Sequence, residues 1–369
     1  VLCGDRPFVR LLSHNNVCGA FFSAIVKGNA GKWLHAFELA ETYYHCGRMK
    51  WLISDSFIGT GKITIEVVPL ASEGGFALRF YTNGFDENFS LLFCFGGTNW
   101  EIPEKQKGFW IGNLREWWDP IYRGNPDICR IGDPRKEILA FGIIPEWSKG
   151  DKIFLNNGNF VIFPPLTGNK KLAVSGRFIS GGKSLKMWAG DISSNDPAKI
   201  INSVSDKMPI VCATTKINSD KKEVFFDVLV NDYEKLSVTK KIKPADNFRQ
   251  AIVSLQKTEL IKTTTPEMYL DAAVAAACHA IAGACDRNSA VFRHGCMAWA
   301  IPFLGWRVMY GATALGLHKL VKKTAYFYLS GQVKNDKLRI KPDPDDSNFG
   351  CIQSMNSRFW GEGRIAPNI

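Results

Sequence analysis

Residues 63–93, ITIEVVPLASEGGFALRFYTNGFDENFSLLF, decide the fold because apolar and polar residues alternate through three short runs. The runs are Ile63–Val67, Phe76–Phe80 and Phe89–Phe93. Successive side chains of a strand point to opposite faces, so a period of two predicts β-strands. Glycine and asparagine between the runs are typical of the turns that join antiparallel strands.

The clearest hairpin is predicted at residues 153–163, IFLNNGNFVIF. Asn157-Gly158 accepts the positive φ values of a tight type I′ turn between two strands. Val224–Val230 adds another strand with the same character. Short strands without helical crossovers run from Phe8 to about Gln256, which predicts a large antiparallel β-sandwich over residues 1–256.

The pattern changes from strand to helix at Thr263–Pro266. Thr264 and Glu267 have the spacing of a capping box, and Pro266 suits a first helical turn, so a helix is predicted to begin there. Further helices are expected from about His294 to Gly311, bent at Pro302, and from about Leu315 to Gly331. Residues 257–369 therefore form the predicted helical part. The first helix shows a repeating apolar face made of Leu270, Val274, Ala277, Ile281 and Ala284.

Composition restricts the class of protein. With 369 residues the chain is longer than one core usually grows, so two domains are expected. It has no apolar run long enough for a membrane span. The formal charge is +11, but the lysines form separated clusters without interleaved aromatic residues, which argues against nucleic acid and is typical of a solvated surface. The same positive field would favour an acidic polysaccharide.

Cysteines and acidic residues give no clear metal or cofactor signal. The ten cysteines are scattered and contain no C-x-x-C pair, so most are expected to be small buried apolar residues. Their even number permits disulfides but does not require them. Acids at residues 343–346 are typical of a solvated turn, with a calcium site as the alternative. We predict no cofactor and no metal.

Several segments resemble one protein family. They are GDRPFVRLL at residues 4–12, GRM-x-W at 47–51, CFGG at 94–97 and HG-x-x-AW-x-x-P-x-LGWR at 294–307. They are similar to large proteins of gut-type Bacteroidetes that carry an uncharacterised β-rich N-terminal domain and continue into an (α/α)6 toroid. Those proteins look like glycoside hydrolases from polysaccharide-degrading gene clusters. Leu317 departs from the resemblance, because Trp is expected before His318.

The resemblance implies where this chain stops and where it acts. Residues 257–369 would hold only the first helical hairpins of the toroid, so the chain is expected to be a truncated N-terminal fragment. A periplasmic or secreted location is implied. An incomplete ring would also leave the apolar faces of Leu317, Leu320 and Val321 without part of their partners, so the fragment is expected to lack full catalytic competence.

A candidate sugar-binding wall lies in the segment 292–328. An indole offers a flat apolar face beside one N–H donor, which suits a sugar ring, and arginine and histidine donate to hydroxyls or a carboxylate. The alternative is a buried helix pair whose polar groups are satisfied. The candidate substrate-binding residues are Arg293, His294, Trp299, Trp306 and Arg307.

Glycoside hydrolysis needs two carboxyl groups beside the scissile bond. Asp286 follows the first helix close to Arg293, and Glu362 lies between Trp360 and Gly363, so these two are the catalytic candidates. Glu267 is better explained as a helix cap and Asp271 as a surface residue. The true pair could also lie beyond residue 369.

The expected function is a carbohydrate-active protein, a glycoside hydrolase that acts from chain ends or on side chains of a plant-type polysaccharide or oligosaccharide. One alternative is a glycoside phosphorylase that holds phosphate with Arg293, His294 and Arg307. Another is a polysaccharide lyase, with His294 or Tyr310 as base and Arg307 against a uronate. A non-catalytic carbohydrate-binding fragment is the remaining alternative.

Overall fold

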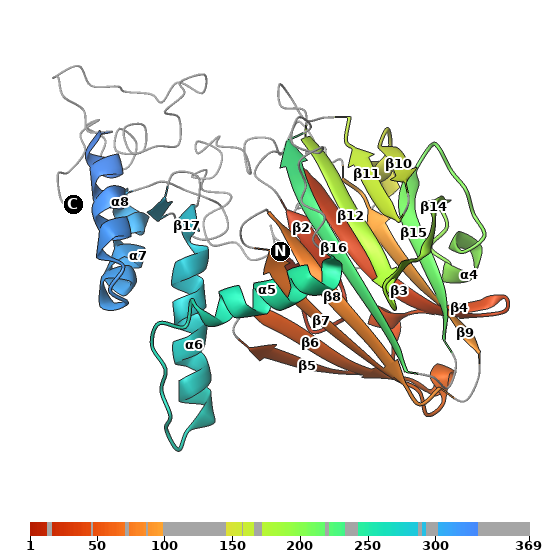
Figure 1. Cartoon of the computed structure of the whole chain (residues 1–369), viewed down its shortest axis with the longest axis horizontal. Helices are drawn as coiled ribbons and strands as arrows, with labels where there is room; N and C mark the ends of the chain where they lie inside the picture. The colour runs from red at the N-terminus through yellow and green to blue at the C-terminus, as the bar shows by residue number, and fades with distance from the viewer. Residues whose placement is uncertain are drawn as a thin grey trace, which may run out of the picture. The chain divides into compact units, whose positions relative to one another are not determined.

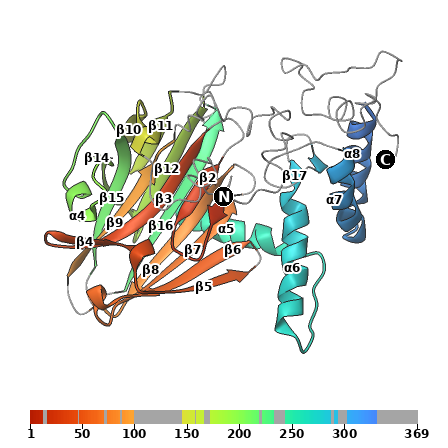
Figure 2. The same ribbon diagram turned by 180° about the vertical axis from the view of Figure 1, so that it is seen from behind.

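The chain folds into two compact units, shown from opposite sides in Figures 1 and 2. This computed structural model describes residues 1–12, 17–45, 47–70, 74–85, 88–98, 145–156, 158–165, 172–217, 221–232, 243–286, 290–292 and 302–330. The first unit contains the described residues up to Gln256, and the second contains those from Lys257 onward.

Two antiparallel sheets make up most of the first unit. The seven-stranded sheet has the order β1-β2-β3-β9-β15-β14, with β4 paired to β3. Its strands are β1 (Leu2–Cys3), β2 (Val9–Leu12), β3 (Cys18–Lys27), β4 (Ala30–Trp33), β9 (Phe89–Gly96), β14 (Lys186–Asp191) and β15 (Pro209–Ile217).

The nine-stranded sheet has the order β10-β11-β12-β16-β8-β7-β6-β5, with β13 paired to β12. Short 3-10 turns connect several strands of this unit, at Leu34–Ala36, Ser56–Ile58 and Pro145–Ser148. The strands are β5 (Leu39–His45), β6 (Arg48–Ser54), β7 (Lys62–Leu70), β8 (Gly75–Asn83), β10 (Lys152–Asn156), β11 (Asn159–Phe163), β12 (Leu172–Ser180), β13 (Lys183–Ser184) and β16 (Lys222–Asp232).

The two sheets pack face to face through a core rich in phenylalanine. Phe21 of the seven-stranded sheet stacks on Phe226 of the nine-stranded sheet, with ring centroids 4.9 Å apart. Phe93 and Phe178 make a second contact between the sheets, at 5.6 Å. All four rings are buried, and this shared apolar core holds the sandwich together.

The strands predicted from alternation are confirmed. The three opening runs lie in β7, β8 and β9, and residues 153–156 and 159–163 form the β10–β11 hairpin, where Asn156 pairs with Asn159. Gly158 has a φ of +81° in that turn, as the Asn-Gly pair requires. Trp51 of the GRM-x-W segment is buried in β6, and its indole N–H donates to the Gly4 carbonyl at 3.1 Å.

The sandwich differs from the prediction at its end, because residues 244–256 form a helix, α5 (Pro244–Gln256), instead of sheet. Figure 1 shows α5 lying across the outer face of the nine-stranded sheet, where it contacts β7, β8 and β16. Phe248 and Ala251 are buried there, with Ile252 and Leu255 beside them. Their spacing of three and four residues is helical, so the correct signal was present in the sequence.

Contacts between buried polar groups connect the ends of β2, β3 and β9 to the turn at residues 145–148 and to Asp151 after it. Thr98 Oγ1 donates to Asp151 Oδ2 at 2.9 Å, and its backbone N–H donates to the same oxygen at 3.2 Å. The Ser148 hydroxyl accepts from the Gly97 N–H, and the Cys18 thiol donates to the Gly97 carbonyl. The guanidinium of Arg10 lies 5.3 Å from the Trp147 ring.

The second unit begins with helix α6 (Met268–Gly283), two residues after the predicted start. Glu267 is its N-cap residue but makes no capping bond with its side chain, so the Thr264–Glu267 capping box is wrong. The Asp271 carboxylate instead accepts the Thr265 N–H at 3.0 Å, and Thr265 Oγ1 accepts the Glu267 N–H. These bonds fix the entry of the chain into the helix.

Two further helices follow a short β-pair, β17 (Cys285–Asp286) with β18 (Val291–Phe292). They are α7 (Pro302–Ala314) and α8 (His318–Ser330). Gly316, at φ +75°, ends α7 with the two hydrogen bonds of a Schellman motif, from the Gly316 N–H to Thr313 and from the Leu317 N–H to Ala312. None of the described helices is long and apolar enough to span a membrane.

The apolar stripe of α8 is partly covered, so the expectation that it lacks part of its partners stays a prediction. Leu317, Leu320 and Val321 are partly buried against the cluster of Phe292, Met309 and Ala312. Exposed apolar side chains also lie on the first turn of α6, where Met268, Tyr269 and Leu270 are more than half exposed. Whether these helices begin a toroid stays a prediction.

Candidate functional site

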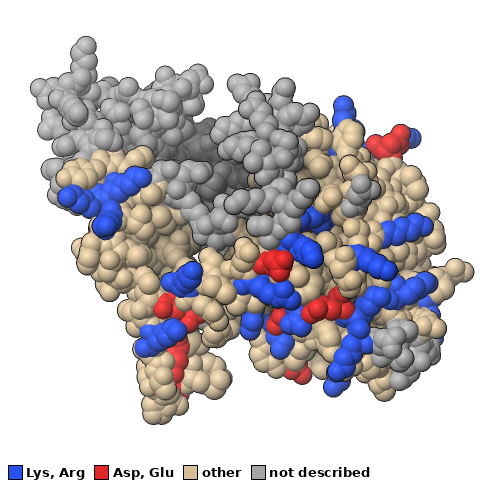
Figure 3. All heavy atoms as spheres, in the orientation of Figure 1, with Lys and Arg blue, Asp and Glu red and all other residues tan. Residues whose placement is uncertain are grey.

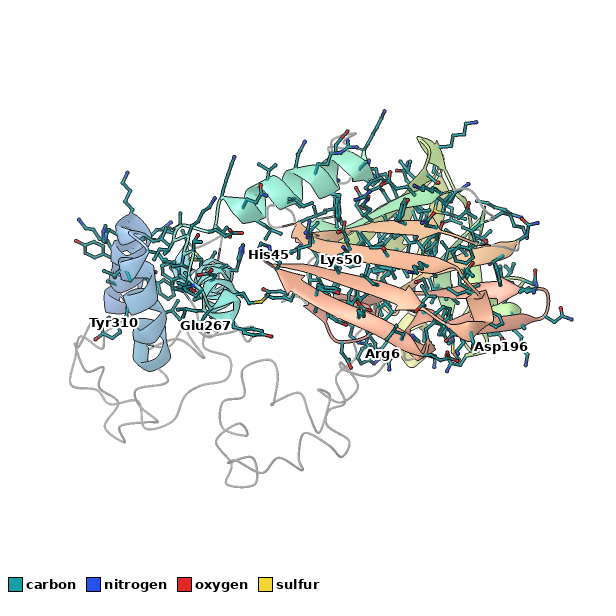
Figure 4. The ribbon with its side chains drawn as sticks, turned by 90° about the horizontal axis from the view of Figure 1, so that it is seen from below. Arg6, His45, Lys50, Asp196, Glu267 and Tyr310 are labelled. Atoms are coloured by element: carbon teal, nitrogen blue, oxygen red, sulfur yellow. The ribbon has the colours of Figure 1, made fainter. Side chains whose placement is uncertain are left out.

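A shallow depression of about 120 Å³ opens on the outer face of the nine-stranded sheet. It is lined by Lys50 on β6, Thr64 and Glu66 on β7, and Arg79 and Tyr81 on β8. We call these five residues the outer-face site. In Figure 4, the labelled Lys50 lies on the side of the strands that carries α5.

Strand register brings these side chains together. Lys50 pairs with Glu66, and Glu66 pairs with Arg79, so the three form one row across β6, β7 and β8. Thr64 and Tyr81 form the next row, because they are also directly paired. The intervening residues, such as Ile65 and Phe80, point into the core. The same alternation that builds the sandwich therefore places the polar residues outside.

Arg79 is held between two carboxylates. Its Nε lies 2.7 Å from Glu223 Oε1 on β16, and its Nη1 lies 3.6 Å from Glu66 Oε2. The Glu66 side chain is 11% exposed, whereas those of Arg79 and Glu223 are each 41% exposed. Figure 3 shows basic and acidic side chains interleaved over this face. The ion pairs fix the direction of the guanidinium while leaving part of it open to a ligand.

Tyrosine and lysine extend the site toward the sheet edge. Tyr43 on β5 pairs with Lys50, and the Lys50 ammonium lies 6.0 Å from its ring centre. The Tyr43 hydroxyl donates to Glu41 at 2.8 Å, and this hydrogen bond raises the pKa of the phenol. Tyr43 is 51% exposed, so an aromatic face is available beside the charged row.

Helix α5 bounds the site on the other side. Phe225 of β16 pairs with Arg79, and its ring meets that of Phe248 on α5 at 6.0 Å. Along the strands, the outer-face residues next to Glu66 and Arg79 are Val68 and Ala77, and both are buried in the α5 cluster. The exposed polar part of the sheet therefore ends where the helix begins.

Hydrogen bonding to a polar ligand is the chemistry that this arrangement supports. Lys50 and Arg79 donate, Glu66 and Glu223 accept, and Thr64 and Tyr81 can do either. Both carboxylates lie beside the guanidinium as acceptors, whereas a general acid must carry a proton. Within the described residues, no three His, Cys, Asp or Glu side chains gather as a metal site would require.

Most of the residues predicted to bind sugar or to catalyse hydrolysis lie outside the described structure. Arg293, His294, Trp299 and Glu362 fall outside the described residues. Trp306 and Arg307 belong to α7 and Asp286 belongs to β17, where its backbone pairs with Val291, but none of these three side chains is described. Their roles in binding and catalysis stay predictions.

The outer-face site was missed because each of its residues looks ordinary in its own strand. A charged residue between two apolar ones, such as Glu66 between Ile65 and Val67, is typical of a solvated sheet face. One signal was available, since residues 62–83 form a single hairpin that pairs Glu66 with Arg79. The contributions of β6 and β16 depend on pairing that the sequence alone does not reveal.

Comparison with known families gives one match. Residues 16–101 match the model of a domain of unknown function, DUF4450. This segment contains β3 to β9 and therefore all five residues of the outer-face site. No curated protein matches the chain.

Solved structures that resemble the chain include a bacterial glucoamylase in complex with acarbose, with TM-score 0.48, 8% identity, and 86% of this chain and 46% of that chain covered. A putative kojibiose phosphorylase from the human microbiome has TM-score 0.46, 8% identity, and 88% and 42% covered. A polysaccharide lyase has TM-score 0.27, 11% identity, and 64% and 27% covered. The chain thus spans less than half of each of these proteins.

Proposed function

We propose that this chain is part of a carbohydrate-active protein and that its outer-face site binds a hydroxyl-rich saccharide. The observation that carries the proposal is the row Lys50–Glu66–Arg79, in which donors and acceptors alternate on an exposed sheet beside tyrosine. Each sugar hydroxyl both donates and accepts, so it is matched by a surface that offers both kinds of group at short spacing. The Tyr43 and Tyr81 rings can cover the apolar C–H face of a sugar.

The charge balance favours a neutral sugar over a polyanion at this site. Glu66 and Glu223 offset Arg79, so the row lacks the uncompensated positive charge that draws phosphates. A uronate would also meet these two carboxylates. The proposal therefore assigns neutral, hydroxyl-rich units to the outer-face site and no nucleic acid.

The finer proposal is a glycoside hydrolase that acts from chain ends or on side chains of a complex plant-type polysaccharide, in a periplasmic or secreted location. It rests on the sequence resemblance to large glycoside-hydrolase-like proteins. Glu66 and Glu223 form ion pairs with Arg79, so we do not assign them the catalytic role. We assign it to Asp286 and Glu362, or to residues beyond this chain. A glycoside phosphorylase, a polysaccharide lyase and a non-catalytic binding protein are the alternatives.

Binding of a panel of neutral and acidic oligosaccharides to the purified chain tests the first proposal. Calorimetry should give a dissociation constant for at least one neutral oligosaccharide. Tyr81→Ala should weaken it by roughly fivefold or more, by analogy with bases stacked on aromatic rings, which contribute on the order of 1–3 kcal/mol each. Arg79→Lys should weaken it as well, since lysine keeps the charge but loses the planar fork.

The matched control is Lys183→Ala, which removes an exposed lysine of the same sheet outside the site. It should bind like the wild type, and all variants should keep the wild-type melting temperature within a few degrees. Absence of any bound oligosaccharide, or equal binding by Tyr81→Ala and Arg79→Lys, would refute a saccharide site on this face.

Product analysis of the whole protein separates the enzyme classes. A hydrolase releases reducing sugar without phosphate, and a phosphorylase needs phosphate and yields a sugar phosphate. A lyase yields an unsaturated product that absorbs in the near ultraviolet. If none of these products forms while the oligosaccharide still binds, the non-catalytic alternative holds.

A further inference from the structure

We propose that Cys94 and Cys212 form a disulfide that crosses the centre of the seven-stranded sheet when the chain folds under oxidising conditions. The two residues pair directly across β9 and β15, and their sulfur atoms lie 3.9 Å apart. Both side chains are fully buried. The inference is independent of the saccharide proposal, since the pair lies in the other sheet.

Strand geometry allows the bond. Residues that face each other in an antiparallel pair have Cα atoms about 4.5 or 5.5 Å apart, and disulfides span Cα separations of about 4.4–6.8 Å. The backbone therefore needs no rearrangement, and only the two sulfur atoms must turn toward each other. Register fixes this pairing, because Cys94 lies in a row with Phe22 on one side and Cys212 on the other.

The surroundings of the pair are apolar. On the β14 side, a Cβ atom at Gly190 would come within 2.5 Å of the Cys212 sulfur, so only glycine fits beside it. Phe22, Trp33 and Ile210 close the apolar cluster around the two cysteines. Cys18 is also buried, but its thiol donates to the Gly97 carbonyl at 3.0 Å. That bond gives Cys18 a different, local role.

The reaction needs an external oxidant. The two S–H bonds break and one S–S bond forms, while two electrons and two protons pass to a small disulfide, which leaves as two thiols. Exchange proceeds through a thiolate. Burial raises the pKa of the Cys94 thiol well above its usual range, so the folded reduced pair reacts slowly. Oxidation must therefore occur before the sheet closes, and the finished bond is equally protected from reductants.

The order of folding and oxidation provides the test. One sample of the full chain is refolded with oxidised and reduced glutathione, and a second is refolded in reductant and treated with the same mixture afterwards. Remaining thiols are then alkylated in denaturant and the digest is examined by mass spectrometry. We expect a Cys94–Cys212 linked peptide in the first sample and both cysteines alkylated in the second. Alkylated or differently linked Cys94 and Cys212 in the first sample would overturn the proposal.

Stability gives a second readout that does not depend on digestion. The bond would close a loop between residues 118 apart, so oxidised chain should melt higher than reduced chain, by about 5–15 °C. Cys212→Ala should abolish this difference, while Cys18→Ala should keep it. Comparing oxidised with reduced samples of each variant cancels any packing cost of the substitution. A difference that persists in Cys212→Ala contradicts the proposed bond.

Discussion

Arg177 and Asp227 face each other across β12 and β16, and their side chains form an ion pair that Asn247 of α5 completes. Asn247 Nδ2 donates to Asp227 Oδ2 at 2.6 Å, and Arg177 Nε donates to Asp227 Oδ1 at 3.1 Å. The Asp227 side chain is 1% exposed. This carboxylate links α5 to the sheet, so it also holds in place the helix that bounds the outer-face site.

Removing this carboxylate should therefore destabilise the first unit. Asp227→Ala leaves Arg177 and Asn247 without their acceptor, and losing one partner of a buried pair costs about 3–5 kcal/mol. We expect a loss near the lower value in chemical denaturation, because Arg177 is 19% exposed. Arg249→Ala on the same helix breaks only the exposed pair with Asp246 and should cost less than about 1 kcal/mol. Equal losses would mean that α5 is not anchored through Asp227.

Much of the sandwich could be predicted because strand and turn signals are local. Alternation located β7, β8 and β9, and Asn157-Gly158 located the β10–β11 turn. Which strands pair with each other could not be predicted in this way. β9 follows β8 in sequence but belongs to the other sheet, beside β3 and β15, and this partnership depends on packing between distant segments.

The candidate site was less predictable for the same reason. Glu66 and Arg79 meet within one hairpin, but Glu223 reaches Arg79 from a strand 144 residues away. Residues 244–256 were predicted as sheet, although the spacing of Phe248, Ala251 and Leu255 is helical. Of residues 293–307, the structure describes only the backbone of α7, so their role as a sugar-binding wall stays a prediction.

The buried carboxylate of Asp151 should make stability depend on pH. Burial raises its pKa to about 7, although both hydrogen bonds from Thr98 favour the charged form. The folded chain thus binds a proton more tightly than the unfolded chain, and this contribution to stability is lost as pH rises from about 4 to 7. The loss is up to about 4 kcal/mol, since one pKa unit is worth 1.36 kcal/mol.

Asp151→Asn tests this assignment because it removes the charge and keeps an oxygen that can accept from Thr98. Its unfolding free energy should fall less than that of the wild type between pH 4 and pH 7. Urea denaturation at several pH values measures the difference. Parallel curves for the two proteins would show that Asp151 titrates normally.

The titration of His35 should change the stability in the opposite direction over a similar pH range. Its ring stacks on Trp33 at 6.1 Å, and burial, with Arg6 nearby, lowers its pKa to about 4. The unfolded chain binds the proton more tightly, so stability is lost as pH falls from about 6.5 to 4, by up to about 3 kcal/mol. His35→Phe should remove this loss, and an NMR titration of the ring should place the midpoint well below that of an exposed histidine. A midpoint near 6.5 contradicts the prediction.

Residues 293–307 can be either a sugar-binding wall or part of a helical core. As a wall, Trp299 and Trp306 would contribute stacking energy on the order of 1–3 kcal/mol each to binding. As core residues, their truncation would instead cost about 3–5 kcal/mol of folding stability. The two readings therefore predict losses in different measurements.

Single alanine substitutions at Arg293, His294, Trp299, Trp306 and Arg307 in the whole protein should separate these readings. For each variant, the melting temperature is compared with oligosaccharide affinity and, where activity is found, with kcat/KM. A wall predicts that Arg293→Ala and His294→Ala lose binding or turnover at a nearly unchanged melting temperature, because a donor at a ligand surface holds no core together. A much lower melting temperature in all five, with normal binding by those that still fold, would assign the segment to the core and leave the outer-face site as the remaining saccharide contact in the described chain.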